Sequence, residues 1–180
     1  MRSIIFMKTL FKTILCLSVV LLLTPSSWAQ KKRGPSTLEE RATAVKVARL
    51  LEEDPFHREA KKMREWFTLW LIDVPDIHIE LCTEYLGPVA GSNKNYATEI
   101  FGQTMFASAA FIIEHPNQAT DRVAVNLAGV EGSLKVYESI LKTKPKARWE
   151  FLDALLAKRA SGELMGYVQG ITQTKCKGKS

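Results

Sequence analysis

The feature that most constrains the fold is an apolar stretch near the middle of the chain. It covers residues 100–113 and lies between Glu99 and Glu114. The stretch is too short to cross a bilayer, and a charged residue closes each of its ends. We therefore predict a central buried helix over about 96–114, with the other segments packed around it. The polar or small exceptions within the stretch are Gly102, Gln103, Thr104 and Ser108.

Helical spacing and capping patterns predict further helices on both sides of this stretch. The sequence Ser36–Glu39 has the form of a capping box and predicts a helix over about 37–53. Asp54 as a cap and Pro55 in the first helical turn predict a second helix, whose buried side begins at Phe56. Three more helices are predicted, at about 119–142, 149–156 and 164–171. The chain is thus predicted to be an all-α single domain of six to seven helices, arranged as a compact bundle or a helical-hairpin array.

Residues 76–82 leave two interpretations open. Apolar and polar residues alternate strictly here, which is typical of a strand. The apolar residues Ile77, Leu81 and Tyr85 also recur at the four-residue spacing of a helix. Because no second strand-like segment lies nearby, we favour a helix and keep the strand as the alternative.

Glycines inside the predicted helices indicate close packing. Glycine in a helix costs up to about 1 kcal/mol relative to alanine, so its presence calls for a steric reason. We expect Gly129 and Gly132 to touch the central helix near its own small residues, Gly102, Ser108 and Ala109. A second close contact of this kind is predicted at Gly162, Gly166 and Gly170.

The start of the chain predicts export. A basic beginning is followed by the apolar run 14–23, and the small residues Ser27 and Ala29 precede Gln30 at the spacing of a cleavage site. We predict a signal peptide over 1–29, cleaved before Gln30, and a periplasmic or extracellular mature chain with no stable membrane span. The sequence allows translation to start at Met1 or at Met7.

The charges of the mature chain gather at its ends. The whole chain has a formal net charge of +6, but the excess lies in the leader and in two short tails. The rest is predicted to divide into a basic start over 30–36, a helical domain over 37–175 and a basic tail over 176–180. The basic residues of the two tails are Lys31, Lys32, Arg33, Lys175, Lys177 and Lys179. We interpret them as solvated ends and exclude nucleic acid as a partner, because the domain lacks a basic face.

Two cysteines remain after the leader, and we predict that they pair. Cys82 and Cys176 would lie in an oxidising compartment, where a disulfide is the expected state. An alternative use of Cys82 is as a metal ligand with His78 and Glu80, which would share its face in a strand. Structural zinc normally needs four ligands with paired spacing, so we predict no metal and no other cofactor.

Aromatic residues crowd the second helix. Trp66 and Leu69 point away from the line through Phe67 and Trp70, so one apolar stripe does not hold all four. A helix buried on two sides would explain this, and so would an exposed patch that holds a partner. We take Trp66, Leu69 and Trp70 as the candidate binding patch.

The functional hypothesis is binding without catalysis. The chain shows no nucleophile elbow, phosphate loop or metal motif. We therefore expect an exported helical binding or adaptor protein, with a protein of the cell envelope as its partner and an unknown ligand. One alternative is an envelope hydrolase that uses a single buried carboxylate, Glu131 or Glu99. Another alternative is a carrier of a small apolar ligand.

Overall fold

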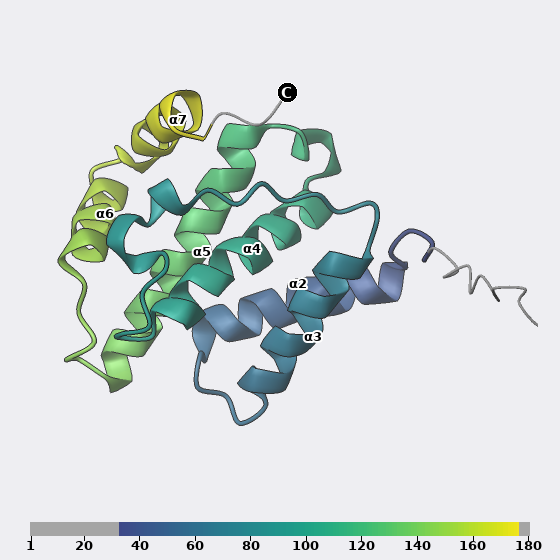
Figure 1. The fold of residues 1–180 in the computed structure, drawn as a ribbon, viewed down its shortest axis with the longest axis horizontal. Coiled ribbons are helices and arrows are strands. Elements are labelled where there is room, and N and C mark those ends of the chain that lie inside the picture. Colours follow the sequence, from purple (N-terminus) through teal and green to yellow (C-terminus); the bar gives the residue numbers. More distant parts are fainter. Residues whose placement is uncertain (1–32, 177–180) are drawn as a thin grey trace, which may run out of the picture. The chain divides into compact units, whose positions relative to one another are not determined.

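The computed structural model describes residues 33–176 and shows an all-helical fold (Figure 1). The helices are α2 (Leu38–Glu53), α3 (Ala60–Asp73), α4 (Ala97–Glu114), α5 (Arg122–Thr143), α6 (Glu150–Ala160) and α7 (Leu164–Thr174). The loops contain the 3₁₀ turns η2 (Thr83–Tyr85), η3 (Gly87–Val89) and η4 (Pro116–Gln118). The all-α class and the six helices confirm the prediction from sequence. The predicted signal peptide, residues 30–32 and residues 177–180 lie outside the described residues.

Helix α4 is the central element, as predicted. It packs along α5, and α2 lies against both helices (Figure 1). Side chains on several faces of α4 are buried, among them Ile100, Phe106 and Ala110. One hydrophobic cluster joins α4 to α5, α6 and α7, and a second joins it to α2 and α3. The molecule therefore has two regions of core that share the α4–α5 pair.

The polar residues of α4 are buried, and neighbouring helices satisfy them. The Gln103 amide donates to the carbonyl of Ala48 on α2 at 2.9 Å. The hydroxyls of Thr104 and Ser133 on α5 lie 2.8 Å apart and share a hydrogen bond. Ser108 likewise donates to a backbone carbonyl of α5. A buried polar group without a partner costs free energy, so these bonds favour one packing of α4 over others.

The predicted contact at Gly129 and Gly132 is confirmed. A β-carbon built on Gly129 would lie 2.9 Å from the carbonyl oxygen of Thr104 on α4. One built on Gly132 would overlap the methyl group of Ala107 on the same helix. Glycine is thus required at both positions of α5 for α4 to approach this closely. Gly102 takes no part, since a β-carbon there would meet no atom within 4 Å.

The second predicted glycine contact is wrong. Gly166 and Gly170 are exposed on α7, and a β-carbon at either position would meet no atom within 4 Å. Helix α7 instead packs through its opposite face, which buries Leu164 and Val168. Gly162 has a backbone φ of +77° in the turn between α6 and α7, a conformation that suits glycine.

Helix α2 forms as predicted, with its capping box shifted by one residue. Thr37 is the cap: its hydroxyl accepts from the Glu40 amide at 3.2 Å, and its own amide donates to the Glu40 carboxylate at 2.8 Å. Ser36, the expected cap, bonds to Asp76 in the loop after α3 instead. The shift follows from this tertiary contact.

Helix α3 begins later than predicted. Asp54 and Pro55 do not start it; the chain makes a turn over 54–59, and the helix begins at Ala60. The Asp54 carboxylate accepts from the Phe56 amide at 3.2 Å, which stabilises the turn. Phe56 is exposed, and its ring packs against the edge of Tyr96. The prediction that Phe56 belongs to a buried helix face is therefore wrong.

Residues 76–82 form no helix, so the interpretation as a helix is wrong: Asp76 lies in a bend, and the chain then runs extended, without regular secondary structure, towards η2 (Figure 1). The alternation of the sequence is visible in the structure: Ile77 is buried and Ile79 is partly buried, while His78 and Glu80 are exposed. Ile77 joins the cluster of α2 and α3, and Cys82 packs against the cluster of α5 to α7. Extended backbone advances about 3.3 Å per residue and a helix about 1.5 Å, so an extended segment spans about twice the distance that a helix of the same length would.

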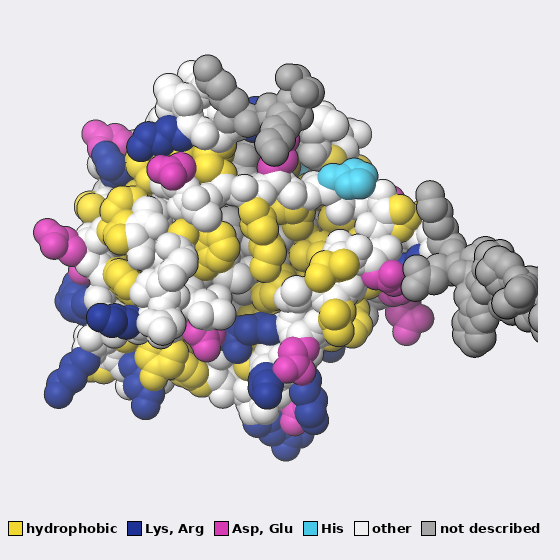
Figure 2. Space-filling model, viewed as in Figure 1, with side chains coloured by type: hydrophobic (Ala, Val, Ile, Leu, Met, Phe, Trp, Pro, Cys, Tyr) yellow, Lys and Arg dark blue, Asp and Glu magenta, His cyan; other side chains and the backbone are white. Residues whose placement is uncertain are grey.

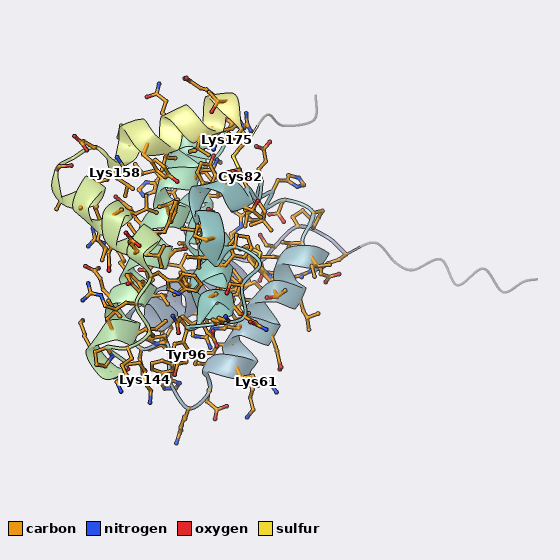
Figure 3. The ribbon with its side chains drawn as sticks, turned by 60° about the vertical axis from the view of Figure 1, so that its left-hand side comes forward. Lys61, Cys82, Tyr96, Lys144, Lys158 and Lys175 are labelled. Atoms are coloured by element: carbon orange, nitrogen blue, oxygen red, sulfur yellow. A yellow bond between two sulfur atoms is a disulfide. The ribbon has the colours of Figure 1, made fainter. Side chains whose placement is uncertain are left out.

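A disulfide joins this segment to the end of α7. Cys82 and Cys176 are bonded, with their α-carbons 5.8 Å apart, which confirms the predicted pairing. Hydrogen bonds support the same contact: the hydroxyls of Tyr85 and Thr172 lie 2.8 Å apart, and Tyr167 donates to the carbonyl of Tyr85 at 3.0 Å. Figure 3 shows Cys82 beside the end of α7. The disulfide closes a loop of 94 residues and limits the freedom of the unfolded chain.

Replacement of glycine by alanine is predicted to have opposite effects on stability at Gly132 and at Gly166. Gly132→Ala is expected to lower the free energy of unfolding by about 1–3 kcal/mol, because its methyl group overlaps Ala107. Gly166→Ala on exposed α7 is the matched control and is expected to raise stability by up to about 1 kcal/mol. Thermal or urea unfolding measures both. Stabilisation by Gly132→Ala would contradict the close packing of α4 and α5.

Candidate functional site

An apolar groove lies between α3 and the extended segment that follows it. Its volume is about 380 Å³, and one residue of α4 contributes to its lining. Figure 2 shows hydrophobic side chains open to the surface between α3 and this segment. The lining residues are Thr68, Leu71, Ile72, Ile77, Ile79, Leu81 and Met105. Only Thr68 among them has a polar side chain, so the groove suits an apolar occupant.

The rim of the groove carries exposed apolar side chains. Ile72 is 77% exposed, Leu69 next to it on α3 is 66% exposed, and Leu81 on the opposite wall is 52% exposed. A single exposed apolar side chain is ordinary, whereas several at one place are informative. Ile72 and Leu81 line the groove, and Leu69 lies one helical turn before Ile72 on α3, so the three form an apolar rim that water covers in the isolated molecule. We call Leu69, Ile72 and Leu81 the apolar rim.

The structure separates the three residues of the predicted binding patch. Trp70 is 5% exposed and belongs to the core, where α3 packs on α2 and α4. Trp66 is partly buried and stacks on Trp70, with ring centroids 5.9 Å apart. Of the three, Leu69 alone is exposed. The exposed apolar surface of α3 thus begins at Leu69 and continues to Ile72, a residue that the sequence analysis did not single out.

The carboxylates proposed for hydrolysis lie away from the groove. Glu99 stands in the first turn of α4, and Glu131 lies in the middle of α5. Both side chains are partly exposed. Glu131 lines a separate hollow of about 330 Å³ with Asp121 and Met165 among its neighbours. The structure does not bring either carboxylate to the groove or to the other.

The most deeply buried carboxylate is Glu52, which the sequence analysis missed. Its side chain is 5% exposed at the end of α2. One oxygen accepts from Arg49 at 2.8 Å and the other from Lys135 of α5 at 3.1 Å. The three residues line a charged cleft of about 600 Å³ between α2 and α5. Because cations occupy both oxygens, we interpret Glu52 as a tie between two helices and not as a proton donor or acceptor.

The three residues considered as metal ligands have other surroundings. His78 is exposed, Glu80 accepts from Arg122 at 2.7 Å, and Cys82 is in the disulfide. Residues 33–176 contain no cluster of three or more histidine, cysteine, aspartate or glutamate side chains arranged to hold a metal ion.

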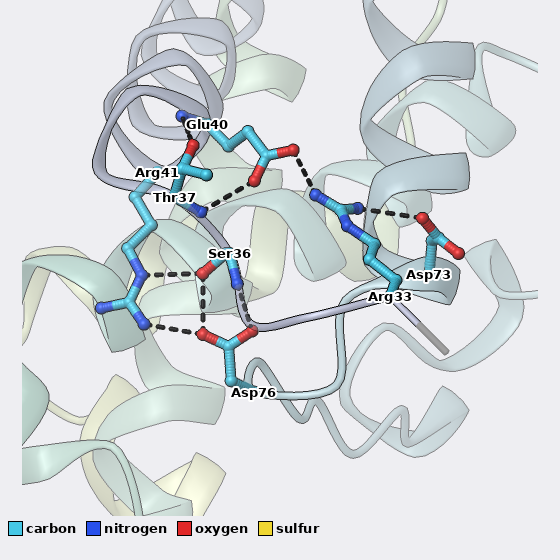
Figure 4. A network of polar contacts seen from close by, with 7 residues as sticks. All are labelled: Arg33, Ser36, Thr37, Glu40, Arg41, Asp73 and Asp76. Carbon is cyan, nitrogen blue, oxygen red and sulfur yellow. Dashed lines mark hydrogen bonds and ion pairs between the residues drawn. The ribbon is translucent and has the colours of Figure 1, made fainter. Parts of the chain in front are cut away.

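A polar network fixes the start of the groove wall (Figure 4). The Asp76 carboxylate accepts from the amide of Ser36 at 2.8 Å, from its hydroxyl at 2.7 Å and from Arg41 at 2.7 Å. Partial burial would raise the pKa of Asp76, but these hydrogen bonds and the charge of Arg41 lower it to about 2. Arg33 extends the network by pairing with Asp73 at the end of α3.

Comparisons with known proteins give no information on what the groove binds. The chain matches no protein-family model, no curated protein sequence and no solved structure. Among the helices in the described part of the chain, none is both long enough and apolar enough to cross a membrane.

The Asp76 network predicts a pH-dependent contribution to stability. The pKa of Asp76 is lowered from its ordinary 3.8 to about 2 in the folded state, so its contribution is complete above about pH 4 and is lost as the pH falls towards 2. Asp76→Asn is expected to lower the free energy of unfolding by about 1–2 kcal/mol at pH 7, after allowance for solvent screening. Urea unfolding between pH 2 and pH 7 measures the difference.

The matched control is Asp73→Asn. Asp73 is 63% exposed and bonds only to Arg33 among the described residues, so its loss is expected to cost less than about 1 kcal/mol. An equal effect of the two substitutions, or a difference that persists unchanged at pH 2, would contradict the role given to Asp76.

Proposed function

We propose that this chain is an exported binding protein that acts through the apolar groove of α3. The apolar rim is the observation that carries the proposal. Ile72 and Leu81 stay exposed in the lining of a concave site, with exposed Leu69 one helical turn before Ile72 on α3, although the same chain buries residues of this kind throughout its two core regions. Covering them with a partner would remove apolar surface from water and stabilise the complex.

The chemistry of the groove supports binding over hydrolysis. A general acid or base has to reach the reacting atoms, and Thr68 supplies the only polar side chain in the lining. Glu99 and Glu131 lie elsewhere on α4 and α5. The hydrolase alternative thus receives no support from the site that has the clearest shape.

The open shape of the groove favours a larger partner over a small ligand that the protein would carry. A carrier encloses most of a small ligand's surface, whereas Ile72 and Leu81 leave this site open along its rim. An occupant would remain in water on one side. This favours a larger surface, from which apolar groups enter the groove.

Export is part of the proposal, and the disulfide between Cys82 and Cys176 supports it, because such bonds persist in oxidising compartments. Expression of the full chain in a bacterium with a periplasm is expected to release a mature form that begins at Gln30 or within a few residues of it. Intact mass measurement of the recovered protein, without reduction, checks both the cleavage and the disulfide. An uncleaved leader or two free thiols would contradict the proposed export.

The groove itself is tested with an environment-sensitive dye. Anilinonaphthalene sulfonate is expected to bind the folded protein and to bind about fivefold more weakly to Ile72→Gln and to Leu81→Gln, the equivalent of about 1 kcal/mol of lost apolar contact. Met165→Gln is the control, because Met165 is 58% exposed on α7, outside the groove. Fluorescence titration gives the affinities, and thermal unfolding shows that the variants remain folded. Equal binding to all four proteins would contradict the groove as the site.

A further inference from the structure

Exposed lysines gather at one end of the domain. Lys142, Lys144 and Lys146 lie at the end of α5 and in the loop that follows it, and all three are exposed. Figure 3 shows Lys144 at the end of the molecule opposite Cys82, and Figure 2 shows lysine and arginine side chains along the lower edge, where Figure 1 places the end of α5. A basic face was not expected from the sequence, because acidic residues balance the lysines over the domain as a whole.

A second loop brings another lysine to this end. The Asn95 amide donates to the carbonyl of Arg148 at 3.2 Å, and the Trp149 indole donates to the carbonyl of Asn95 at 3.2 Å. These bonds join the loop before α4 to the loop after α5. Exposed Lys94 therefore lies one residue, and Lys146 two residues, from the place where the two loops meet. We use the name basic end for Lys94, Lys142, Lys144 and Lys146.

The backbone of both loops is held in place. Ala147 is 5% exposed and anchors the lysine loop in the core, and the Trp149 amide donates to the Tyr137 hydroxyl at 2.9 Å. Asn95 and Tyr96 have φ angles of 47° and 60°, a left-handed conformation that persists in such residues only where neighbouring contacts fix it. Loops that are fixed before binding lose little conformational freedom when a partner binds.

The charges of the basic end are not neutralised within the described domain. None of its four lysines forms an ion pair with a carboxylate of residues 33–176. Lysines elsewhere do so, for example Lys135 with Glu52 and Lys175 with Glu84. The chain over 139–149 carries four basic residues and no acidic one. This end therefore attracts anionic partners.

An aromatic pair lies beside these lysines. Phe56 is 40% exposed, and its ring contacts the ring of Tyr96 edge-on, with centroids 5.0 Å apart. Tyr96 directly follows Asn95 of the joined loops, and Figure 3 shows it at the same end of the molecule as Lys144. The basic end thus carries an exposed apolar ring as well as positive charge.

Lysines around an exposed aromatic ring are the chemistry that recognises an anionic lipid surface. Lysines attract the negative headgroups, and aromatic rings lie favourably at the level of the headgroups. We propose that the basic end docks the protein on an anionic bilayer, with its lysines on the headgroups and Phe56 in the interface. The inference goes beyond the proposed function and does not depend on it, because Lys144 and Cys82, which ends the groove wall, lie at opposite ends of the molecule (Figure 3).

A bilayer fits these observations better than a soluble polyanion does. Arginine binds single phosphate groups through two parallel hydrogen bonds, whereas lysine is a point charge that needs no fixed geometry. The arginine of this loop, Arg148, is paired with Asp153, which leaves the lysines to act by charge alone. Phe56 gains from an apolar layer, which a polyanion in water does not offer.

The test is cosedimentation with vesicles, using the protein recovered after expression of the full chain. Vesicles that contain phosphatidylglycerol are compared with vesicles of phosphatidylcholine alone at about 0.1 M salt, where charges are only partly screened. We expect at least about tenfold tighter binding to the anionic vesicles, and loss of this difference at about 0.5 M salt. Equal binding to both kinds of vesicle at low salt would overturn the inference.

Variants of the basic end locate the contact. Each lysine near such a surface contributes about fivefold, so Lys144→Gln with Lys146→Gln is expected to weaken binding to anionic vesicles by about tenfold or more. Phe56→Gln is expected to weaken it by about fivefold. Thermal unfolding shows that the variants remain folded. Anionic-vesicle binding that the double variant leaves unchanged would overturn the inference.

A charge-matched control comes from other lysines without an ion pair among residues 33–176. Lys46 lies in the middle of α2, and Figure 3 shows Lys158 on α6, far from Lys144. Lys46→Gln with Lys158→Gln removes the same charge and is expected to leave vesicle binding unchanged. An equal loss in this control would show non-specific attraction and would contradict a defined docking surface.

Two further outcomes identify the partner and separate this inference from the proposed function. Tighter binding to the soluble polyanion heparin than to the vesicles, through the same lysines, would replace the bilayer with a polyanion. Ile72→Gln is expected to leave vesicle binding unchanged, and a loss equal to that of the lysine variant would move the lipid contact to the groove. Lysine-dependent vesicle binding without dye binding in the groove would support this inference and overturn the proposed function alone.

Discussion

The close approach of α4 and α5 is the contact on which the rest of the structure depends. Gly129 and Gly132 let the backbones of the two helices come together, and the hydroxyls of Thr104 and Ser133 pair across the contact. Both core regions share this pair of helices. A methyl group at Gly132 would push α4 outward and disturb both regions at once. The weak helix propensity of glycine is therefore offset by packing that no larger residue permits.

The position of α3 follows from this arrangement. Helix α2 lies against both central helices, and its Glu52 reaches Lys135 on α5 beside Gly132. Helix α3 packs on the outside and buries Phe67 and Trp70 against α2 and α4. Its other face borders the groove, with the extended segment and Met105 of α4 on the opposite side. The extended segment leaves part of that face uncovered, and this uncovered part is the groove.

The sequence was sufficient to predict the parts of the fold that depend on local pattern or on steric exclusion. The central helix, the contact at Gly129 and Gly132 and the pairing of Cys82 with Cys176 are all as predicted. The same steric argument failed at Gly166, where a β-carbon would meet no neighbouring atom. A glycine in a helix therefore indicates close packing only on a face that another element covers. Which face of α7 is covered depends on the whole packing.

The candidate site was harder to predict, because its residues come from three separate segments. The aromatic pattern of α3 pointed to Trp66 and Trp70, which stack and lie largely in or beside the core. Ile72 can be recognised as a site residue only when the structure shows that it is exposed at the end of α3. Met105 can be recognised only when the structure shows that α4 contributes to the lining of the groove. The alternation in residues 76–82 was the one usable signal for the other wall, and it indicated the extended chain that is found.

Both ends of that wall are fixed, and this bears on how the site works. The Asp76 network holds one end against the start of α2, and the disulfide of Cys82 holds the other against α7. A wall tied at both ends loses little conformational freedom when a partner binds, so more of the apolar contact remains as affinity. One of the two ties is a bond that forms in oxidising compartments. The proposed export and the proposed binding site therefore depend on each other, because the wall reaches its tied form where the disulfide can form.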